Sequence, residues 1–456
     1  MNKFSRLMLA PELLQAVEAL GYKEMTEIQA DALPPMLHAH DVLAQAKTGS
    51  GKTAAFSLAV LAQLQSEQAH LQSLVLCPTR ELADQVSKEI RALARFIPNV
   101  KVLSLCGGVP VRLQLPSLAH QPHIVVGTPG RIQDLIDRQA LLLDDLRSVV
   151  VDEADRMLDM GFLDAIGRIL EKAPATRTTW MFSATYPEEV REISRRFQNN
   201  PVAVTVADRH DESVIRQQFY QVDSTAKPDA VLALLLTHRP ESCLIFCNTK
   251  IDTGKLADAL WKTGVPAIAL HGDLEQRERE EALLQFANGS CRVLVATDVA
   301  ARGLDIKALP MVIAYELSND ADVHVHRAGR TGRAGESGAV FSLVSGREMG
   351  RVAAIERVLG RPIEWTRLPQ VRGLPPLPAP AMKTLLIEAG RQDKLRPGDI
   401  LGALTGEAGL QAVQAGRIDV FPTRSYVALE RDCLDAVVKK LRTGKIKGRK
   451  IRVRKL

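Results

Sequence analysis

A glycine-rich loop between a short apolar run and a helical pattern constrains this chain more than any other feature. Residues 46–53 read AKTGSGKT, follow the apolar run at residues 41–46, and lead into a helical pattern over residues 53–63. A loop in this position points successive backbone N–H groups and a helix N-terminus at one spot, which suits phosphate groups. We therefore expect a parallel α/β domain that binds a phosphorylated ligand.

The residue types in this loop indicate that the phosphorylated ligand is a nucleoside triphosphate. Gly49 and Gly51 allow the backbone to turn and to approach the phosphates closely. We expect Lys52 to reach the β- and γ-phosphates and the Thr53 hydroxyl to ligate Mg²⁺. The predicted phosphate site comprises Thr48, Gly49, Ser50, Gly51, Lys52 and Thr53.

An acidic motif follows another apolar run. Residues 152–155 read DEAD and come directly after three valines at residues 149–151. A carboxylate at the end of a buried parallel strand lies at the edge where open α/β sheets bind ligands. We expect Asp152 to hold Mg²⁺, directly or through water, and Glu153 to orient or deprotonate the attacking water.

Short apolar runs alternate with longer helical patterns through the first two-thirds of the chain. Such runs are typical of strands buried on both faces of a parallel sheet, with crossover helices between them. A charged stretch at residues 208–213 divides the runs into two groups, which predicts two α/β domains joined by a short linker. The runs lie at residues 41–46, 73–77, 123–127, 148–152 and 178–183, and then at 243–247, 267–271, 292–297, 311–315 and 339–344.

The excess positive charge lies at the end of the chain. Residues 379–456 contain 17 Lys and Arg against 8 Asp and Glu, a net charge of +9. The rest of the chain contains 42 basic and 45 acidic residues, a net charge of −3. This asymmetry favours a nucleic-acid-binding end, and a solvated basic tail is the simpler alternative.

A proline-rich stretch precedes the basic end. Residues 368–381 contain five prolines, which exclude a helix or a central strand, so we expect a semi-stiff spacer that gives reach without rigid docking. The element order after it is β-α-β-β-α-β, which predicts the ferredoxin-like plait of RNA-recognition modules. The predicted strands lie at residues 383–387, 417–421, 425–430 and 450–454, and the predicted helices at 396–404 and 432–441.

Composition narrows the setting in which the chain works. No run approaches the roughly 18 apolar residues that cross a bilayer, and the first ten residues lack the apolar block of a signal peptide. The 6 cysteines are scattered without a Cys-x-x-Cys pair, which argues against a disulfide scaffold. We expect a cytoplasmic monomer with no membrane partner.

With its DEAD motif at residues 152–155, the chain resembles the DEAD-box ATP-dependent RNA helicases over about residues 4–345. The resemblance implies two tandem RecA-like domains that hydrolyse ATP and locally separate RNA duplexes. Residues 21–29 (GYKEMTEIQ) resemble the adenine-reading motif, which implies that Gln29 reads adenine and that Phe4 stacks on it. Met25 stands where the family usually has Pro, a change expected to affect loop rigidity more than chemistry.

Further motifs of the first domain resemble those that contact the RNA backbone, namely residues 78–82 (PTREL), 107–108 (GG) and 128–131 (TPGR). By this resemblance the RNA contacts come from Arg80, Gly108, Thr128 and Arg131. Residues 183–185 (SAT) resemble the motif that couples hydrolysis to strand separation. The implied coupling residues are Ser183, Thr185, Asp155 and, from the second domain, His326.

The second domain carries its own set of family motifs. Residues 246–249 (FCNT) and 271–273 (HGD), with Gln276 and Arg279, resemble RNA-facing motifs. Residues 297–305 resemble the motif that touches RNA and ribose, which implies roles for Thr297 and Asp305 respectively. Residues 326–333 resemble the arginine-finger motif, so Arg330 and Arg333 would reach the γ-phosphate from the other domain. Hydrolysis would then require the two domains to close.

Residues 76–86, 270–277, 293–307 and 396–406 resemble the bacterial DbpA subfamily. Its C-terminal RNA-recognition-type domain implies 23S rRNA and 50S subunit precursors as partners. The strand at residues 425–430 carries one aromatic residue, Tyr426, where an RNA-recognition motif has a longer aromatic run. We therefore expect RNA contacts from Lys447, Arg449 and Arg452 rather than base stacking on the sheet.

The predicted organisation has three domains and two connections. They are an ATP-binding domain at residues 1–207, a linker at 208–214, a second RecA-like domain at 215–365, a proline-rich linker at 366–381 and an RNA-binding domain at 382–456. One alternative is a DNA helicase of the same superfamily, against which Gln29, Asp155 and the RNA-module end argue. The other is a non-catalytic RNA-binding clamp, which would lack Lys52, Glu153 or Arg330, and none is lost.

Overall fold

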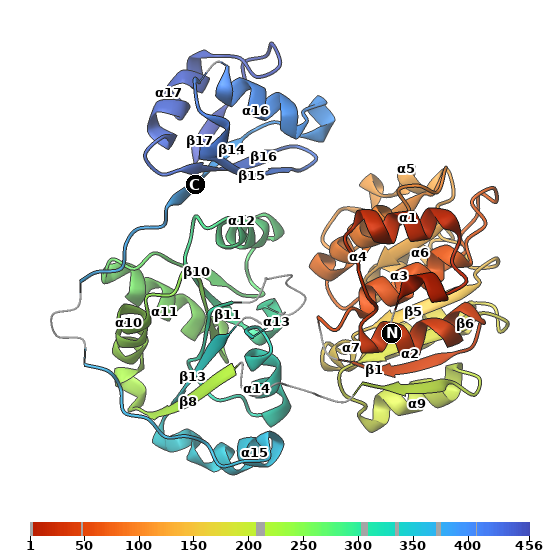
Figure 1. Ribbon diagram of the computed structural model, residues 1–456, viewed down its shortest axis with the longest axis horizontal. Helices are drawn as coiled ribbons and strands as arrows, with labels where there is room; N and C mark the ends of the chain where they lie inside the picture. Colours follow the sequence, from red (N-terminus) through yellow and green to blue (C-terminus); the bar gives the residue numbers. More distant parts are fainter. Residues whose placement is uncertain are drawn as a thin grey trace. The chain divides into compact units, whose positions relative to one another are not determined.

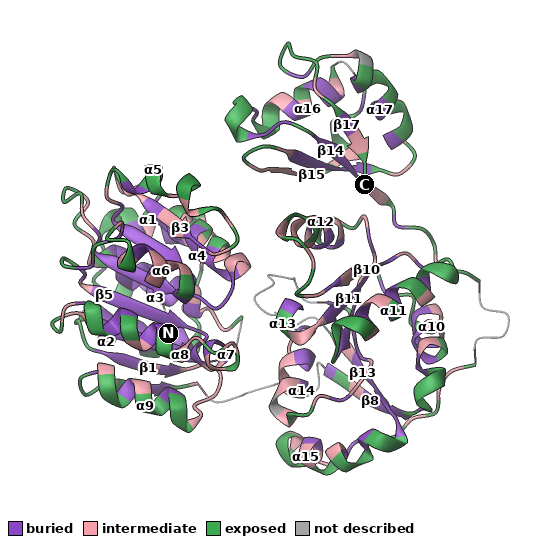
Figure 2. Ribbon diagram, turned by 180° about the vertical axis from the view of Figure 1, so that it is seen from behind, coloured by how far each residue is buried: buried purple, intermediate pink, exposed green. Residues whose placement is uncertain are grey.

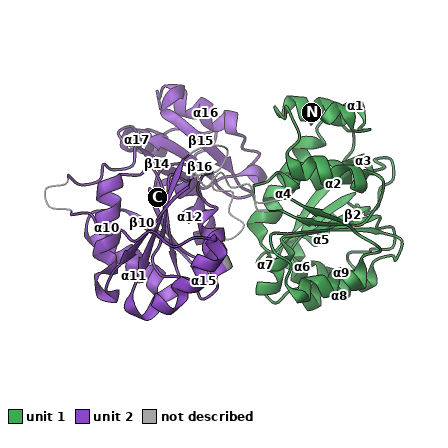
Figure 3. Cartoon of the chain, turned by 60° about the horizontal axis from the view of Figure 1, so that its bottom comes forward, with its two compact units in different colours: residues 1–209, 303–305 green, residues 210–302, 306–456 purple. Residues whose placement is uncertain are grey.

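The computed structural model describes residues 3–46, 49–206, 215–301, 309–332, 337–370, 375–406 and 408–456. These residues form three sheets (Figure 1). They fall into two compact units, the first with the described residues up to 206 and the second with those from 215 onward (Figure 3). The predicted linker at residues 208–214 lies outside the described residues.

The first unit is built on a parallel sheet with the strand order β3-β4-β2-β5-β6-β1-β7. Every residue of β2, β4, β5 and β6 is buried, which explains why their sequences are continuous apolar runs (Figure 2). The strands are Val42–Gln45 (β1), Ser73–Leu76 (β2), Val102–Leu105 (β3), Ile124–Gly127 (β4), Ser148–Asp152 (β5), Thr178–Ser183 (β6) and Val202–Thr205 (β7).

Helices cover both faces of this sheet. α1 to α4 contribute to one apolar cluster, which includes Ile28 and Phe56, and α6 to α8 contribute to the cluster on the other face, which includes Ile132 and Ile169. The helices are Pro11–Ala19 (α1), Glu27–Leu37 (α2), Lys52–Ala62 (α3), Arg80–Leu93 (α4), Leu115–Leu118 (α5), Pro129–Asp137 (α6), Ala154–Asp159 (α7), Leu163–Lys172 (α8) and Glu188–Phe197 (α9).

The second unit contains a parallel sheet with the order β10-β11-β9-β12-β13-β8. Its strands are Ile215–Gln221 (β8), Cys243–Cys247 (β9), Ala267–Leu270 (β10), Val293–Thr297 (β11), Met311–Ala314 (β12) and Gly338–Val344 (β13). Its helices are Lys227–His238 (α10), Lys250–Lys262 (α11), Gln276–Ala287 (α12), Asp298–Ala301 (α13), Ala321–Ala328 (α14) and Met349–Leu359 (α15).

The C-terminal sheet is antiparallel, with the order β15-β16-β14-β17, and α16 and α17 pack on one of its faces. Its elements are Met382–Ile387 (β14), Pro397–Thr405 (α16), Ala415–Val420 (β15), Ser425–Glu430 (β16), Leu434–Thr443 (α17) and Val453–Lys455 (β17). The predicted fold class, two parallel-sheet α/β domains followed by a ferredoxin-like domain, is confirmed.

Two strands of this domain differ from the prediction at their ends. β15 ends at Val420 because the Phe421 N–H donates to the Arg424 carbonyl at 2.8 Å and closes a turn around Pro422. β17 begins at Val453 rather than at residue 450, and it follows a turn that two backbone hydrogen bonds close between Ile446 and Arg449.

The other face of the C-terminal sheet lies against α12, and the sequence did not predict this contact. Side chains alternate along a strand, so Leu385 faces the domain's own helices while Leu386 packs with Tyr426 against Leu284 of α12. The Tyr426 hydroxyl donates to Glu281 Oε1 at 3.0 Å, and Arg424 Nη2 lies 3.0 Å from Glu280 Oε2.

The proline-rich linker is also held by the second unit. Arg239 Nη2 donates to the carbonyl of Pro376 at 3.1 Å, and Leu377 packs on the core of the second parallel sheet. We expected a spacer without rigid docking, and this expectation is wrong. The linker itself contacts the second parallel-sheet domain, and the C-terminal domain that follows it contacts α12 through apolar side chains and an ion pair.

Candidate nucleotide site and RNA interface

The glycine-rich loop lies at the carboxyl end of β1, and α3 begins at Lys52. Gly49 and Gly51 have φ angles of 88° and 94°, in the left-handed region that glycine adopts without strain. A Cβ atom at Gly51 would lie 2.6 Å from Gln29 Nε2, so this position also requires glycine for close packing.

Lys52 and Asp152 bring two opposite charges together in the interior of the first unit. Lys52 Nζ lies 3.2 Å from Asp152 Oδ1, and the two residues are 4% and 0% exposed. Burial lowers the pKa of Lys52, but the carboxylates of Asp152, Glu153 and Asp155 outweigh it and leave that pKa raised. Burial raises the pKa of the Asp152 carboxyl against the opposing effect of Lys52.

The Asp152 carboxylate fits a metal ligand. Both of its oxygens are buried, and while Oδ1 faces the Lys52 ammonium, Oδ2 has no hydrogen-bond donor among the residues that the structure describes. A buried carboxylate oxygen without a donor is unfavourable, and a second cation would satisfy it. With Thr53 at the start of α3, Asp152 supplies the oxygen ligands that Mg²⁺ prefers.

The adenine-reading motif is connected to the phosphate loop. Gln29 Oε1 accepts from the Thr26 N–H at 2.9 Å, and Gln29 Nε2 donates to the Gly51 carbonyl at 3.0 Å. Phe4 is buried and stacks on Tyr22, with ring centroids 6.4 Å apart. Gln29 therefore stabilises the phosphate loop. It is also the residue for which the sequence predicts adenine recognition.

The acidic motif points its side chains in separate directions. Glu153 adopts a left-handed backbone with φ of 57° and precedes α7, and its Oε2 pairs with Arg156 Nη1. Asp155 Oδ2 accepts from the Thr185 N–H at 2.9 Å and from Thr185 Oγ1 at 3.0 Å. The Asp155 N–H donates to Ser183 Oγ at 3.0 Å, so the predicted coupling residues of this unit lie together.

The predicted RNA-contacting residues of the first unit follow the carboxyl ends of β2, β3 and β4. Arg80 begins α4, and its Nη1 would lie 2.7 Å from a Cβ atom at Gly108, so the guanidinium covers this glycine. Thr128 precedes α6, and its Oγ1 accepts from the Gly107 N–H at 3.2 Å. Arg131 donates to the Val109 carbonyl at 2.8 Å and so supports the same loop.

In the second unit, Thr297 ends β11 and Arg330 follows α14, where it is buried. His326 lies within the last turn of α14. Three predicted site residues, Thr48, Asp305 and Arg333, lie outside the described residues.

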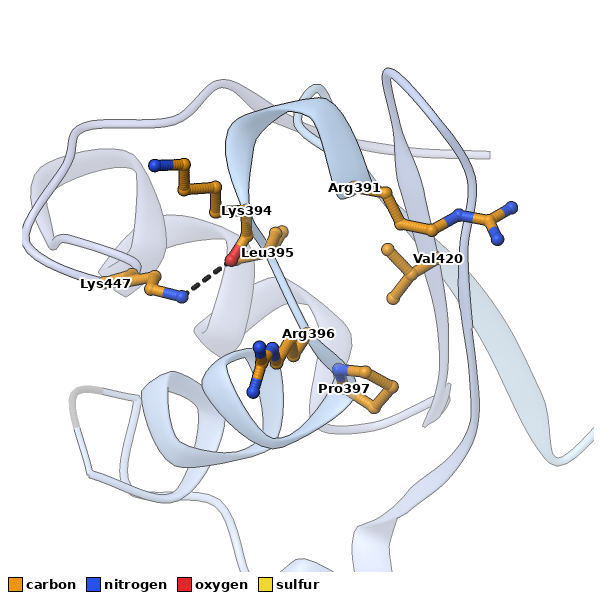
Figure 4. A pocket seen from close by; sticks show the side chains of 7 residues that line it. All are labelled: Arg391, Lys394, Leu395, Arg396, Pro397, Val420 and Lys447. Carbon is orange, nitrogen blue, oxygen red and sulfur yellow. Dashed lines mark hydrogen bonds between the residues drawn. The ribbon is translucent and has the colours of Figure 1, made fainter. Parts of the chain in front are cut away.

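Basic side chains surround a hollow of about 670 Å³ in the C-terminal domain (Figure 4). Its lining residues are Arg391, Lys394, Leu395, Arg396, Pro397, Val420 and Lys447. Lys447 Nζ donates to the Lys394 carbonyl at 2.6 Å and pairs with Asp399 Oδ2 at 2.9 Å. Arg449 and Arg452 line a second hollow beside it, of about 230 Å³.

Comparisons with known proteins agree with this geometry. The DEAD/DEAH box helicase family matches residues 26–193, the helicase conserved C-terminal domain matches residues 226–335, and the DbpA RNA binding domain matches residues 384–455. The ATP-dependent RNA helicase DbpA of Escherichia coli (strain K12) is 50% identical over 457 residues, which covers 100% of both chains. The chain belongs to the DbpA subfamily of DEAD-box RNA helicases.

Other relatives share the two parallel-sheet domains. The DEAD-box ATP-dependent RNA helicase CshA of Geobacillus kaustophilus (strain HTA426) is 42% identical over 81% of this chain and 79% of its own. The structure of S. cerevisiae Dbp5 bound to RNA and ADP BeF3 has a TM-score of 0.74 at 32% identity, covering 81% of this chain and 96% of that chain. This helicase is thus an RNA-stimulated ATPase with RNA as its partner, and the predicted enzyme class is confirmed.

No helix in the described part of this helicase is long and apolar enough to cross a membrane.

Sequence reasoning assigned no role to Arg327, which lies at the centre of the second unit's motifs. Arg327 is 1% exposed, donates to Asp298 through Nε and Nη2 at 2.8 and 2.7 Å, and donates to Asn248 Oδ1 at 2.8 Å. It therefore joins the segments after β9 and β11 to the helix that leads to Arg330. The sequence carried no signal for this role, because the burial that makes Arg327 require charged partners is set by the tertiary fold.

We predict that Arg327→Met destabilises the second unit by about 3 kcal/mol, because Asp298 and Asn248 lose a planar donor that no neighbour replaces. Chemical denaturation of the full chain measures the effect. Arg347→Met, at an exposed position in the same unit, is the matched control and should leave stability within about 0.5 kcal/mol. Equal stability of the two variants would contradict the role given to Arg327.

Proposed function

We propose that this helicase remodels 23S rRNA during assembly of the large (50S) ribosomal subunit. The observation that carries the proposal is the basic hollow of the C-terminal domain, which combines four cationic side chains with the apolar surface of Leu395, Pro397 and Val420. Such a surface suits an unstacked base and its phosphates. Identity to the Escherichia coli DbpA helicase extends over this domain and supports the same class of target.

The first unit would bind ATP between the phosphate loop and the acidic motif. The loop from Thr48 to Thr53 would surround the phosphates, and Lys52 would be the point charge that contacts the β- and γ-phosphates. Asp152 and Thr53 would hold Mg²⁺, which neutralises phosphate charge when it is bound. Glu153 would accept the proton of the attacking water, and the other face of the site would hold adenine between Phe4 and Gln29.

Residues of the second unit would complete the site when the two units close. Arg330 and Arg333 would stabilise charge on the transferred phosphoryl group, and Asp305 would bind the ribose. Asp155, Ser183, Thr185 and His326 would couple this step to the RNA.

Two sets of residues would bind RNA. The helicase core would hold the backbone through Arg80, Gly108, Thr128, Arg131 and Thr297, and such contacts carry little sequence information. The C-terminal domain would select the target through Lys447, Arg449 and Arg452. Tyr426 is 0% exposed and lies against α12, so its ring is not offered to a base in this arrangement.

We further propose that the enzyme works as a monomer in the cytoplasm, with precursor particles of the 50S subunit as its partners. RNA as the partner disfavours the DNA-helicase alternative. The intact Lys52–Asp152 pair with Glu153 beside it disfavours the non-catalytic clamp.

We predict that Lys52→Ala abolishes productive ATP binding, because it removes the positive charge that would contact the β- and γ-phosphates. Glu153→Gln should retain ATP and RNA in a long-lived complex while hydrolysis falls at least about 100-fold, since glutamine keeps the shape but accepts no proton. Nucleotide binding and single-turnover hydrolysis measure the two effects separately. Wild-type hydrolysis by Glu153→Gln would refute the assignment of the base.

We predict that replacing Lys447, Arg449 and Arg452 together with alanine weakens binding to 23S rRNA fragments and lowers the log–log salt slope by about two to three. Tyr426→Phe should have a smaller effect. A matched control replaces three exposed cations elsewhere, Lys255, Lys262 and Arg347, for the same loss of charge. The proposal predicts a larger loss for ribosomal than for unrelated RNA of equal length in the first variant. A loss by one common factor on both RNAs would indicate a nonspecific basic tether.

A further inference from the structure

Arg156 is a buried cation that the proposed chemistry does not yet use. It lies in α7, directly after the acidic motif, and is 8% exposed. Its Nη1 pairs with Oε2 of Glu153, and the two side chains are 9% and 4% exposed. The pair therefore lies inside the first unit rather than on a solvated surface.

The neighbouring acids of the motif have partners other than Arg156. Asp152 belongs to β5 and faces Lys52, and Asp155 is held by the backbone and hydroxyl of Thr185. Glu153 lies between them in the sequence and has a left-handed backbone, which costs energy for residues other than glycine. Its side chain makes no capping hydrogen bond to α7. Arg156 provides a side-chain contact that fixes the direction of this carboxylate.

The geometry favours an orienting contact over a latch that must open. A buried guanidinium that lost its carboxylate would remain as an uncompensated charge, which is strongly unfavourable. The contact engages Oε2, so Arg156 can keep this oxygen throughout the reaction while Oε1 acts on the water. Glu153 directly follows Asp152, whose carboxylate lies 3.2 Å from Lys52 Nζ, so the backbone at Glu153 adjoins the predicted phosphate site.

We propose that Arg156 is a positioning residue for ATP hydrolysis, which holds Glu153 by Oε2 so that Oε1 faces the attacking water. The inference rests on the proposed role of Glu153 as the base. In the step itself, the water oxygen bonds to the γ-phosphorus and the water proton passes to Oε1. The bond between the γ-phosphorus and the bridging oxygen breaks, and its electron pair leaves with ADP.

The test compares Arg156→Met, Arg156→Lys and Arg156→Gln with wild type in RNA-stimulated hydrolysis by the full chain. We expect Arg156→Met to lower kcat about 10- to 100-fold, within the contribution of a positioned base, with KM for ATP changed less than about threefold. Arg156→Lys should recover part of the loss because it restores a donor to Oε2. Arg138→Met removes an exposed arginine–aspartate pair of the same unit and should leave kcat unchanged.

A double-mutant cycle separates positioning from a merely structural role. If Arg156 acts through Glu153, Arg156→Met should slow single-turnover hydrolysis in the wild-type background and cause no further loss in the Glu153→Gln background. Equal losses in both backgrounds would overturn the inference, as would an unchanged kcat or a raised hydrolysis rate without RNA, the sign of a latch. Should Arg156→Met fail to fold, Arg156→Lys and Arg156→Gln carry the same cycle.

The failure of this inference and that of the proposed function are distinguishable. If Glu153→Gln is inactive while Arg156→Met hydrolyses ATP at the wild-type rate, the positioning role alone is refuted. If Glu153→Gln itself retains wild-type hydrolysis, the base assignment is refuted and the inference with it.

Discussion

The buried pair of Lys52 and Asp152 is the interaction around which the first unit is arranged. Lysine and aspartate are rarely buried, because desolvation of two charges offsets most of their attraction. Here the second oxygen of the aspartate, Oδ2, also has no hydrogen-bond donor among the described residues, so the fold retains a buried polar atom that it does not satisfy. Such a site is stabilised by what it binds, and a phosphate with its cation supplies the missing charges.

The strand order places this pair close to the predicted coupling residues of the first unit. β6 lies between β1 and β5, so the loop after β6 runs beside both the phosphate loop and the acidic motif. Asp155 holds that loop through Thr185, and Gln45 of β1 donates to the carbonyl of Ala184 at 3.1 Å. A change at the phosphates thus has a short, hydrogen-bonded route to the predicted coupling residues.

Local patterns predicted most of the fold and the nucleotide site. The glycine-rich loop and the valine-rich strand before Asp152 are contiguous in sequence, and their chemistry depends on the few residues around them. The β-α-β-β-α-β order of the C-terminal domain could also be predicted, because the hydrophobic residues of each element recur with the period of a helix or of a strand.

Contacts between segments that are distant in the chain could not be predicted from the sequence. Tyr426 meets Glu281 across 145 positions of the chain, and nothing near either residue indicates the other. The roles of Arg156 and Arg327 depend on their burial, which the sequence does not show. A buried arginine is unfavourable unless neighbouring residues pair with its charge. The turn around Pro422 ends β15 at Val420, because the Phe421 N–H donates to the Arg424 carbonyl within that turn.

We propose that nucleotide and RNA binding are coupled through the contact between the acidic motif and residues 183–185. Equilibrium titrations of a non-hydrolysable ATP analogue with and without RNA, and of RNA with and without the analogue, test it most directly. We expect each ligand to tighten the binding of the other by the same factor, and this factor to fall toward one when Ser183 and Thr185 are both replaced by alanine. Independent binding of the two ligands to the wild-type helicase would contradict it.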